Sequence, residues 1–464
     1  MTSADFVQAV ESNMDFVPTL DQRHAIEMFA KYLLNYQSDN LMLLKGYAGT
    51  GKTTLVSAFV KTLTQMKVHT VLLAPTGRAA KVLGNYTRRP AYTIHKEIYR
   101  IVSTPNGNRL RLKQNTYAHT IFFVDEASMI YDEQCSNRKS VFDRRSLLDD
   151  LFAYVNEGKH CALVFIGDSA QLPPVGSMFS PALDKDYLAN HYSKFVYEYE
   201  LKEVMRQLHD SGVLLHATQL RNRMECQDFS LYSFEPSSED FVRLDMRYFM
   251  EELQLAYNEY GTSGTVVITK SNKQANMLNA AIRNRLLFME NELDCGDFVM
   301  SVKNNYFWLP KDAATPFIAN GDILEIMTVR HFEEFAGFRF ATIRFRMLDY
   351  DTKPIEAKVL LDTLTTEEAA LSYEKSMQLY AAVEEKYSHL PTKKKRQEAM
   401  QDDEYLNALQ IKFAYVQTCH KTQGGQWEKV FVFQWNAEQQ QSIDYYRWAY
   451  TALTRAKSKI FLIE

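Results

Sequence analysis

One octapeptide near the N-terminus fits the phosphate-binding pattern G-x-x-x-x-G-K-[ST]. Its glycines let the backbone wrap a polyphosphate, since no Cβ stands in the way, and the following helix N-terminus adds partial positive charge. The lysine of such a loop reaches the outer phosphates, and the threonine after it binds a magnesium ion. We therefore expect a nucleoside triphosphate and Mg²⁺ here, held by Gly46, Tyr47, Ala48, Gly49, Thr50, Gly51, Lys52, Thr53 and Thr54.

A second chemical signal is a pair of carboxylates that follows an apolar run. Ile121 to Val124 leads directly into Asp125 and Glu126. A strand covered on both faces is continuously apolar, and ligands of open α/β sheets bind at the carboxyl ends of the strands. Asp125 is therefore expected to hold the magnesium ion, and Glu126 to polarise the attacking water. The competing interpretation is an acidic helix N-cap.

The elements that must position these groups follow from the alternation of short apolar runs with helical patterns. The first half of the chain predicts a doubly wound α/β core. A second α/β set begins after about residue 210 and is completed by apolar runs near the C-terminus. The strand-like runs are 41–44, 70–74, 121–124 and 162–166 in the first set, and 265–269, 429–434 and 459–463 in the second.

A long excursion, residues 295–410, interrupts the second α/β set. Its first half alternates like antiparallel β structure and predicts a small barrel or sheet. Its second half predicts a helical hairpin that opens at the capping box 365–368, with a stripe of tyrosines and Met377 expected in the hairpin core. The basic run 393–396 could touch a phosphate backbone, but such a run is more often a solvated helix face.

A smaller insertion lies between the phosphate loop and the acidic strand. The dipeptide Asn106-Gly107 stands between two strand-like flanks, which is a strong β-hairpin signal. The arms of this hairpin carry several arginines, more positive charge than the balance of the chain predicts. A binding role and an ordinary surface hairpin are both open at this point.

Composition limits the class of protein. The 464 residues carry a formal net charge of −4, so a nucleic-acid surface would have to be a local groove. The five cysteines show no C-x-x-C spacing and fit reduced thiols. No run of eighteen apolar residues and no signal peptide is visible, so we expect a cytoplasmic protein without membrane contact.

Four further segments cluster short hydrogen-bond donors beside strands. They are 73–80, 163–176, 416–425 and 450–456. Threonine, histidine and backbone amides of this kind suit sugar-phosphate contacts, which position a strand without reading its sequence. An arginine far from the phosphate loop suits a finger that completes the site from a second domain.

With these segments in order, the chain resembles superfamily 1 DNA helicases of the RecD-like, Dda-type branch over nearly its whole length. The resemblance implies two RecA-like domains, an inserted Src-homology-3-like barrel and a helical hairpin. It also implies ATP as the nucleotide, read by Gln22, with Gln171 coupling phosphate to DNA and with Arg206 and Arg455 on the γ-phosphate. The implied division is 1–85 with 116–210, 86–115, 211–294 with 411–464, 295–364 and 365–410.

The resemblance further implies partners and direction. Single-stranded DNA and duplex junctions are the expected partners, translocation is expected from 5′ to 3′, and the protein is expected to be monomeric. The hairpin tip around Asn106 would split the duplex. The residues expected near the single strand are Pro75, Thr76, Thr93, His95, Asn106, His420 and Lys421.

Two other functions compete with a helicase. A DNA-stimulated ATPase could strip proteins from DNA, or drive a helicase-nuclease complex, without unwinding alone. A small-molecule kinase would also use the phosphate loop, but it leaves the second α/β domain and Arg455 unexplained.

Overall fold

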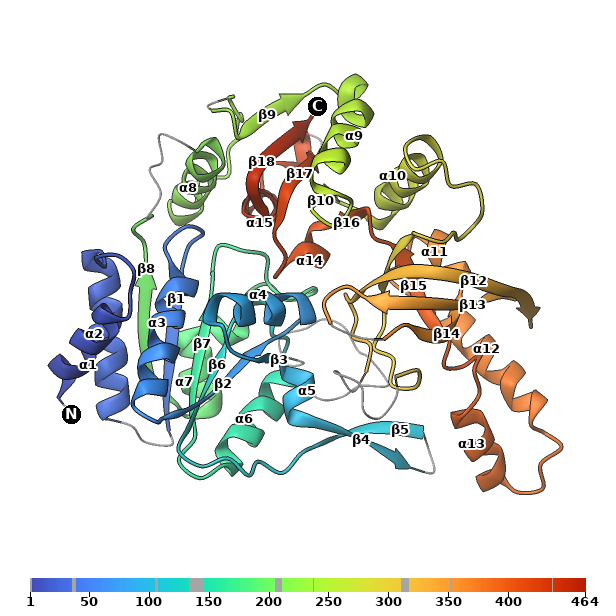
Figure 1. Ribbon diagram of the computed structural model, residues 1–464, viewed down its shortest axis with the longest axis horizontal. Coiled ribbons are helices and arrows are strands. Elements are labelled where there is room, and N and C mark those ends of the chain that lie inside the picture. Colours follow the sequence, from blue (N-terminus) through green and yellow to red (C-terminus); the bar gives the residue numbers. More distant parts are fainter. Residues whose placement is uncertain are drawn as a thin grey trace.

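The computed structural model describes residues 2–35, 39–104, 107–132, 146–204, 211–236, 238–309, 317–350, 353–435 and 437–464. Two expected site residues, Arg206 and Asn106, lie outside the described residues. The described part forms two α/β domains, a barrel, a helical hairpin and a β-hairpin (Figure 1). Short 3-10 helices occur at Ala127–Met129, Pro181–Leu183, Met246–Tyr248 and Ala437–Gln439.

The first α/β domain is built on a six-stranded parallel sheet with the order β3-β2-β6-β7-β1-β8. The apolar runs of the sequence are its central strands, which are buried on both faces. The edge strand β8 alternates polar residues and was not predicted. The strands are β1 (Asn40–Gly46), β2 (His69–Ala74), β3 (Ala91–Thr93), β6 (Thr120–Val124), β7 (Ala162–Gly167) and β8 (Phe195–Leu201). The helices are α1 (Ser3–Ser12), α2 (Leu20–Leu34), α3 (Lys52–Gln65), α4 (Gly77–Thr87), α5 (Ile94–Ile98), α6 (Leu147–Glu157) and α7 (Lys185–Tyr192).

The second α/β domain contains a five-stranded parallel sheet with the order β16-β10-β17-β18-β9. Its strands are β9 (Phe241–Leu244), β10 (Thr265–Thr269), β16 (Val416–Thr418), β17 (Trp427–Phe433) and β18 (Ala456–Ile463). Its helices are α8 (Gly212–Glu225), α9 (Phe249–Tyr260), α10 (Asn272–Arg285), α14 (Cys419–Thr422) and α15 (Ile443–Leu453). The fold class expected from the sequence, two α/β domains with an inserted barrel, is confirmed.

The inserted sheet closes into a five-stranded barrel. Its strands are β11 (Phe298–Ser301), β12 (Ile323–Phe335), β13 (Phe338–Met347), β14 (Ile355–Leu360) and β15 (Leu409–Phe413). The fifth strand, β15, pairs with β11 and with β14 after the chain has returned from the helical hairpin. The domain boundary expected at 411 therefore cuts through β15, because strand pairing across a long connection leaves no local signal.

The helical hairpin consists of α12 (Tyr373–Lys386) and α13 (Lys393–Gln401), and it follows the short α11 (Asp362–Thr365). The expected helix start at 365–368 is wrong, because α12 begins after the N-cap Ser372. The expected core stripe is wrong for three of its members, although Tyr387 does pack against the hairpin core. Tyr373, Met377 and Tyr380 are 61%, 41% and 42% exposed, whereas Leu379 and Val383 are buried.

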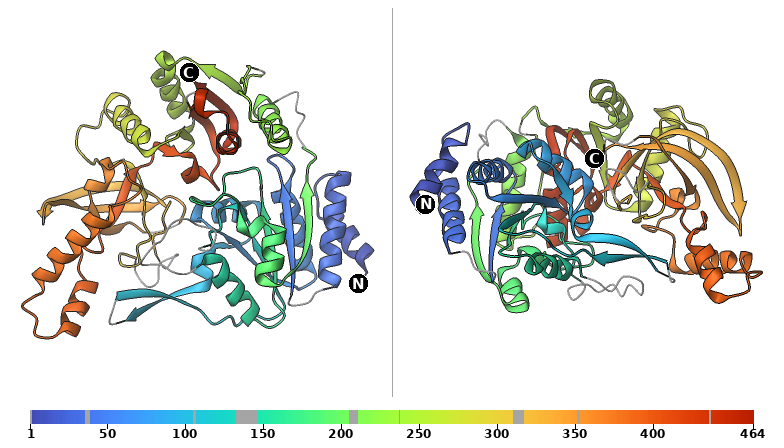
Figure 2. Two further views of the ribbon diagram at one scale, coloured as in Figure 1. Left: turned by 180° about the vertical axis from the view of Figure 1, so that it is seen from behind. Right: turned by 60° about the horizontal axis from the view of Figure 1, so that its bottom comes forward.

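The predicted β-hairpin is formed by β4 (Tyr99–Thr104) and β5 (Gly107–Leu112), and we call it the pin hairpin. It extends from the first α/β domain toward the helical hairpin, where β5 contacts α13 (Figure 1). Figure 2 shows that the barrel and the helical hairpin form one end of the molecule, while the N-terminal helices lie at the other.

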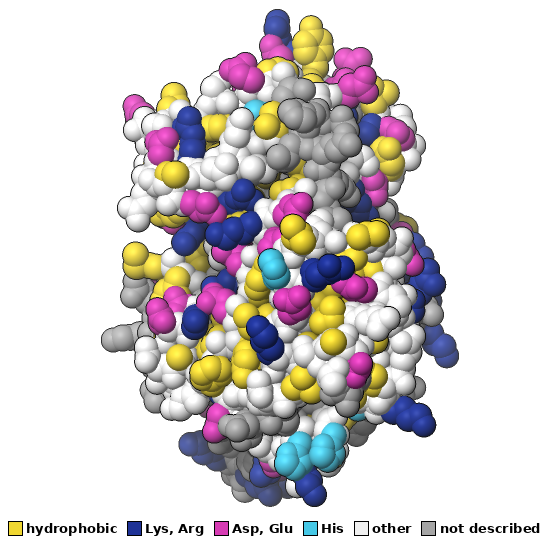
Figure 3. Space-filling view, turned by 90° about the vertical axis from the view of Figure 1, so that its left-hand side faces the viewer, with side chains coloured by type: hydrophobic (Ala, Val, Ile, Leu, Met, Phe, Trp, Pro, Cys, Tyr) yellow, Lys and Arg dark blue, Asp and Glu magenta, His cyan; other side chains and the backbone are white. Residues whose placement is uncertain are grey.

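One face of the molecule illustrates the nearly balanced charge of the sequence. On the face shown in Figure 3, basic and acidic side chains are interspersed rather than gathered into a field of one sign. In the described parts of the chain, no helix has both the length and the apolar character that crossing a membrane requires.

Candidate nucleotide site and nucleic-acid interface

The phosphate loop joins the end of β1 to the start of α3. Gly49 and Gly51 have φ values of 80° and 82°, in the left-handed region that favours glycine. A Cβ on Gly46 would lie 2.9 Å from both the Leu201 Cβ and the Thr50 hydroxyl oxygen. The glycine spacing read from the sequence is therefore a requirement of the backbone path around the loop.

Lys52 points back into this loop. Its Nζ donates to the carbonyl oxygens of Gly46 at 2.5 Å and of Tyr47 at 2.9 Å. The Thr50 hydroxyl donates to the same Tyr47 carbonyl at 2.8 Å. These carbonyls hold the ammonium at the mouth of the loop, where phosphate oxygens can accept its hydrogen bonds in their place.

The carboxylates of the acidic strand lie beside this lysine because β6, β7 and β1 are neighbours with a common direction. Burial, with the adjacent negative charge of Glu126, raises the pKa of Asp125 to about 7, and the Lys52 charge opposes that rise. A divalent cation would relieve this repulsion. Asp125 and the half-buried Thr53 offer the hard oxygen ligands that Mg²⁺ prefers, so these residues fit the ion.

Gln171 follows β7 and is buried at 6% exposure. Among the described residues, its side-chain oxygen Oε1 has no hydrogen-bond partner. A buried acceptor without a partner is costly, which indicates a water or ligand contact. This agrees with a role at the phosphate, and that role stays a prediction.

A tyrosine of the second domain reaches the phosphate loop, a contact that no sequence motif indicated. The Tyr450 hydroxyl accepts a hydrogen bond from the Ala48 amide at 2.9 Å and donates to Asp168 Oδ2 at 2.7 Å. Leu172 continues this contact, since its amide donates to the Thr451 hydroxyl at 2.9 Å. The segment after β7 therefore touches both the nucleotide loop and the second domain.

Arg455 is buried within the second domain. Its guanidinium donates to the carbonyl oxygens of Thr451 at 3.0 Å and Gly425 at 3.3 Å, and to the Thr454 hydroxyl at 3.1 Å. All three partners belong to the domain that carries it. The finger role on the γ-phosphate stays a prediction and requires the guanidinium to leave these carbonyls.

Gln22 is buried in the first turn of α2, next to the phosphate loop. Its Nε2 donates to the Thr50 carbonyl at 3.3 Å, while its Oε1 accepts from the Thr19 amide at 3.2 Å. The second bond belongs to the capping box of α2. Adenine recognition by this amide stays a prediction.

The residues of the first domain that are expected to contact single-stranded DNA lie at or near the starts of helices. The hydroxyls of Thr76 and Thr93 cap α4 and α5, and each accepts one backbone amide at 3.2 Å. Pro75 precedes the first of these caps. His95 lies 5.9 Å, ring to ring, from Phe317 of the barrel, and burial lowers its pKa to about 4. His95 is therefore uncharged at neutral pH.

The second domain supplies His420 and Lys421 from α14. Burial lowers the pKa of Lys421 to about 8. The loop after α14 lies against α4, since a Cβ on Gly424 would stand 3.2 Å from the Thr76 hydroxyl oxygen and 2.9 Å from the Ala79 Cβ. This loop therefore brings the second domain against Thr76, one of the predicted DNA-contacting residues of the first domain.

Comparisons with known proteins agree with this arrangement. A family profile described as an AAA domain matches residues 19–233, and one described as a UvrD-like helicase C-terminal domain matches residues 413–463. The ATP-dependent RecD2 DNA helicase of Deinococcus radiodurans is 32% identical over 159 residues, which is 34% of this chain and 20% of that protein. The ATP-dependent DNA helicase dda of phage T4 is 23% identical over 341 residues, covering 69% of this chain and 70% of that protein.

Solved structures show a weaker likeness. Pif1 helicase from Bacteroides in complex with ADP-AlF3 and single-stranded DNA aligns over 97% of this chain and 92% of its own, with 17% identity and a TM-score of 0.45. The Candida albicans Pif1 helicase aligns over 97% and 95%, with 17% identity and a TM-score of 0.37.

Proposed function

We propose that this chain, a superfamily 1 protein of the RecD-like, Dda-type group, is an ATP-dependent DNA helicase that moves 5′ to 3′ on single-stranded DNA. Both family profiles and the two curated helicases support the proposal. The matched segment is only a fifth of the RecD2 protein, so the proposed activity of this chain rests on its own nucleotide site.

ATP hydrolysis is the first part of the proposal. Lys52 and the loop amides bind the polyphosphate, and Glu126 accepts a proton from the attacking water. Magnesium, when bound at Thr53 and Asp125, neutralises charge that develops on the phosphate oxygens. Positive charge aimed at the transferring phosphoryl group lowers the free energy of the transition state. This electrostatic stabilisation suits a site that has little covalent chemistry to perform.

Movement along DNA is the second part. The observation that carries the proposal is the Tyr450 hydroxyl, which joins the phosphate loop at Ala48 and the carboxylate of Asp168 to the second domain. A nucleotide that displaces the loop must alter this contact and thereby the position of the second domain. Because Gly424 of that domain lies against Thr76, the same movement shifts the predicted strand-contacting residues.

The test is strand displacement with ATP and magnesium on two partial duplexes, one with a 5′ tail and one with a 3′ tail. We expect unwinding from the 5′ tail and DNA-stimulated ATP hydrolysis. The matched control is Lys52→Ala, which should abolish hydrolysis while strand binding persists.

Three results would count against the proposal. Unwinding from the 3′ tail alone would reverse the polarity. Hydrolysis without displacement would favour a translocase that strips proteins from DNA. Hydrolysis that ignores DNA would refute both functions.

A further inference from the structure

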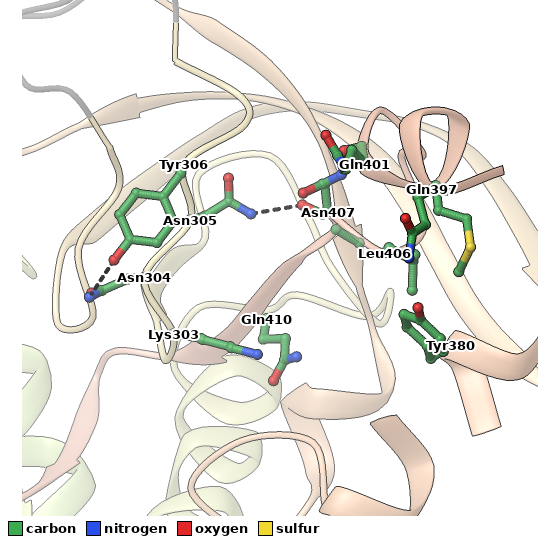
Figure 4. A pocket seen from close by; sticks show the side chains of 12 residues that line it. Lys303, Asn304, Asn305, Tyr306, Tyr380, Gln397, Gln401, Leu406, Asn407 and Gln410 are labelled. Carbon is green, nitrogen blue, oxygen red and sulfur yellow. Dashed lines mark hydrogen bonds between the residues drawn. The ribbon is translucent and has the colours of Figure 1, made fainter. Parts of the chain in front are cut away.

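An open cavity of about 540 Å³, which we call the amide pocket, lies between the barrel and the helical hairpin (Figure 4). Among the residues that the structure describes, its lining comes from 303–306 and 380–410, and none of these belongs to an α/β domain. A volume of this order is typical of sites for small organic molecules. The nucleotide site described above does not use it.

The lining chemistry is that of uncharged hydrogen bonding. Lys303 and Gln410 point toward one another on one side, and Tyr380, Gln397 and Gln401 come from the helical hairpin (Figure 4). Among the described lining residues, Lys303 is the charged one and none is acidic. Amides supply both donors and acceptors, which match the edges of a nucleobase, and the lysine matches a phosphate.

One polar atom of this wall has no partner. The Gln401 side-chain nitrogen Nε2 is buried and makes no hydrogen bond to any described residue. A buried donor in that state is costly unless a ligand or water accepts from it. A carbonyl oxygen or ring nitrogen of a base becomes such an acceptor when the Gln401 amide turns from its buried position into the pocket.

Tyr380 connects the pocket to the surface. It is 42% exposed and belongs to the exposed stripe that the sequence placed in the hairpin core. An accessible aromatic ring is a platform on which any base can stack. The basic run opens α13 nearby, where Lys393 and Lys395 are exposed while Lys394 approaches Glu398 at 3.8 Å.

The position of the pocket indicates which of the two DNA strands it would bind. β5 of the pin hairpin contacts α13, so the pin hairpin and the pocket share one helix. The DNA strand that we expect between the two α/β domains would instead lie near Thr76 and His420. A second strand parted at the pin hairpin would therefore pass along α13.

We propose that the amide pocket binds one unpaired nucleotide of the displaced DNA strand, with its base stacked on Tyr380 and paired to Gln401 and its phosphate near Lys303. This proposal rests on the proposed helicase function, since only strand separation supplies a displaced strand. It adds a binding site that the ATPase cycle does not require.

The direct test is photo-crosslinking of the full chain without ATP, so that motor activity is not needed. Forked DNA carries 5-iodouracil close to the junction, either in the displaced tail or in the 5′ tail. We expect a crosslink from the displaced tail that falls about fivefold or more in Tyr380→Ala, in line with the loss of a stacking contact. Tyr373→Ala, on the same helix but outside the pocket, is the matched control and should crosslink like wild type.

Two outcomes would overturn the proposal. A crosslink that survives Tyr380→Ala, or one that comes mainly from the 5′ tail, removes the displaced strand from the pocket. Full competition by millimolar thymidine monophosphate assigns the pocket to a free nucleotide instead.

A second variant separates binding from folding. Gln401→Leu removes the unpaired amide, so its melting temperature should equal or exceed that of wild type, while affinity for forked DNA falls relative to the same duplex without a displaced tail. Equal loss on both substrates would refute the site. ATP hydrolysis in the presence of single-stranded DNA should be unchanged in both pocket variants. If the wild-type protein did not hydrolyse ATP, the proposed helicase function would be refuted, while the crosslinking result would still decide whether the pocket binds DNA.

Discussion

The buried ion pair of Arg283 and Asp297 stands where the chain enters the barrel, and its loss is our most quantitative prediction. Arg283 on α10 donates to both Asp297 oxygens at 2.8 Å, and its Nη2 also donates to the Asn291 carbonyl at 3.0 Å. The side chains are 7% and 0% exposed. Tyr415, where the chain leaves the barrel, donates to the same carboxylate at 3.0 Å.

Arg283→Met removes this guanidinium and leaves a buried carboxylate with two donors, the Tyr415 hydroxyl and the Asp294 amide. Breaking a buried pair from one side costs about 3 to 5 kcal/mol. At about 2 to 4 °C per kcal/mol for a unit of 150–250 residues, the melting temperature should fall by about 6 to 20 °C. Unwinding should suffer more than ATP hydrolysis, because the barrel would be held less firmly against the second domain.

Differential scanning calorimetry measures the shift. Arg339→Met is the matched control, since Arg339 pairs with Glu292 at 2.9 Å but is 47% exposed, and such pairs contribute about 0 to 1 kcal/mol. Adding Asp297→Leu to Arg283→Met should restore part of the stability, because an apolar pair of similar volume avoids the stranded charge. A melting temperature within about 2 °C of wild type for Arg283→Met would refute the reasoning.

Three further predictions concern the site. Tyr450→Phe leaves the Ala48 amide and Asp168 Oδ2 without these hydrogen bonds, at about 1 to 3 kcal/mol each, while Asp168 Oδ1 still accepts from the Ala170 amide. The contact between the domains is weakened, so DNA-stimulated ATP turnover should fall about tenfold or more, and activity within twofold of wild type would contradict this. Because burial lowers the pKa of Lys421 to about 8, affinity for single-stranded DNA should decrease between pH 7 and pH 9 as the ammonium loses its proton, and Lys421→Met should flatten that dependence in an anisotropy titration. Gln22→Ala should reduce the preference for ATP over GTP in kcat/KM, and an unchanged ratio would remove the adenine role.

Part of the candidate site could be predicted because its signals are local. The glycines of 46–51 are required by the backbone itself, and the strand that ends at Asp125 is recognisable because a central parallel strand is apolar throughout. The Asn-Gly turn likewise predicted the pin hairpin from two residues. Edge strand β8 escaped prediction because one of its faces is partly polar.

The amino-acid sequence by itself determined the fold class, the phosphate loop and the order of the two α/β sets and their insertions, since periodicity and backbone requirements act over a few residues. The tertiary structure alone decided which side chains meet across long separations. Tyr450 reaches Ala48, Arg283 closes on Asp297, and β15 completes the barrel only after the helical hairpin. The exposure of Tyr380 belongs to the same class, because a helical stripe shows which face residues share but not what that face packs against.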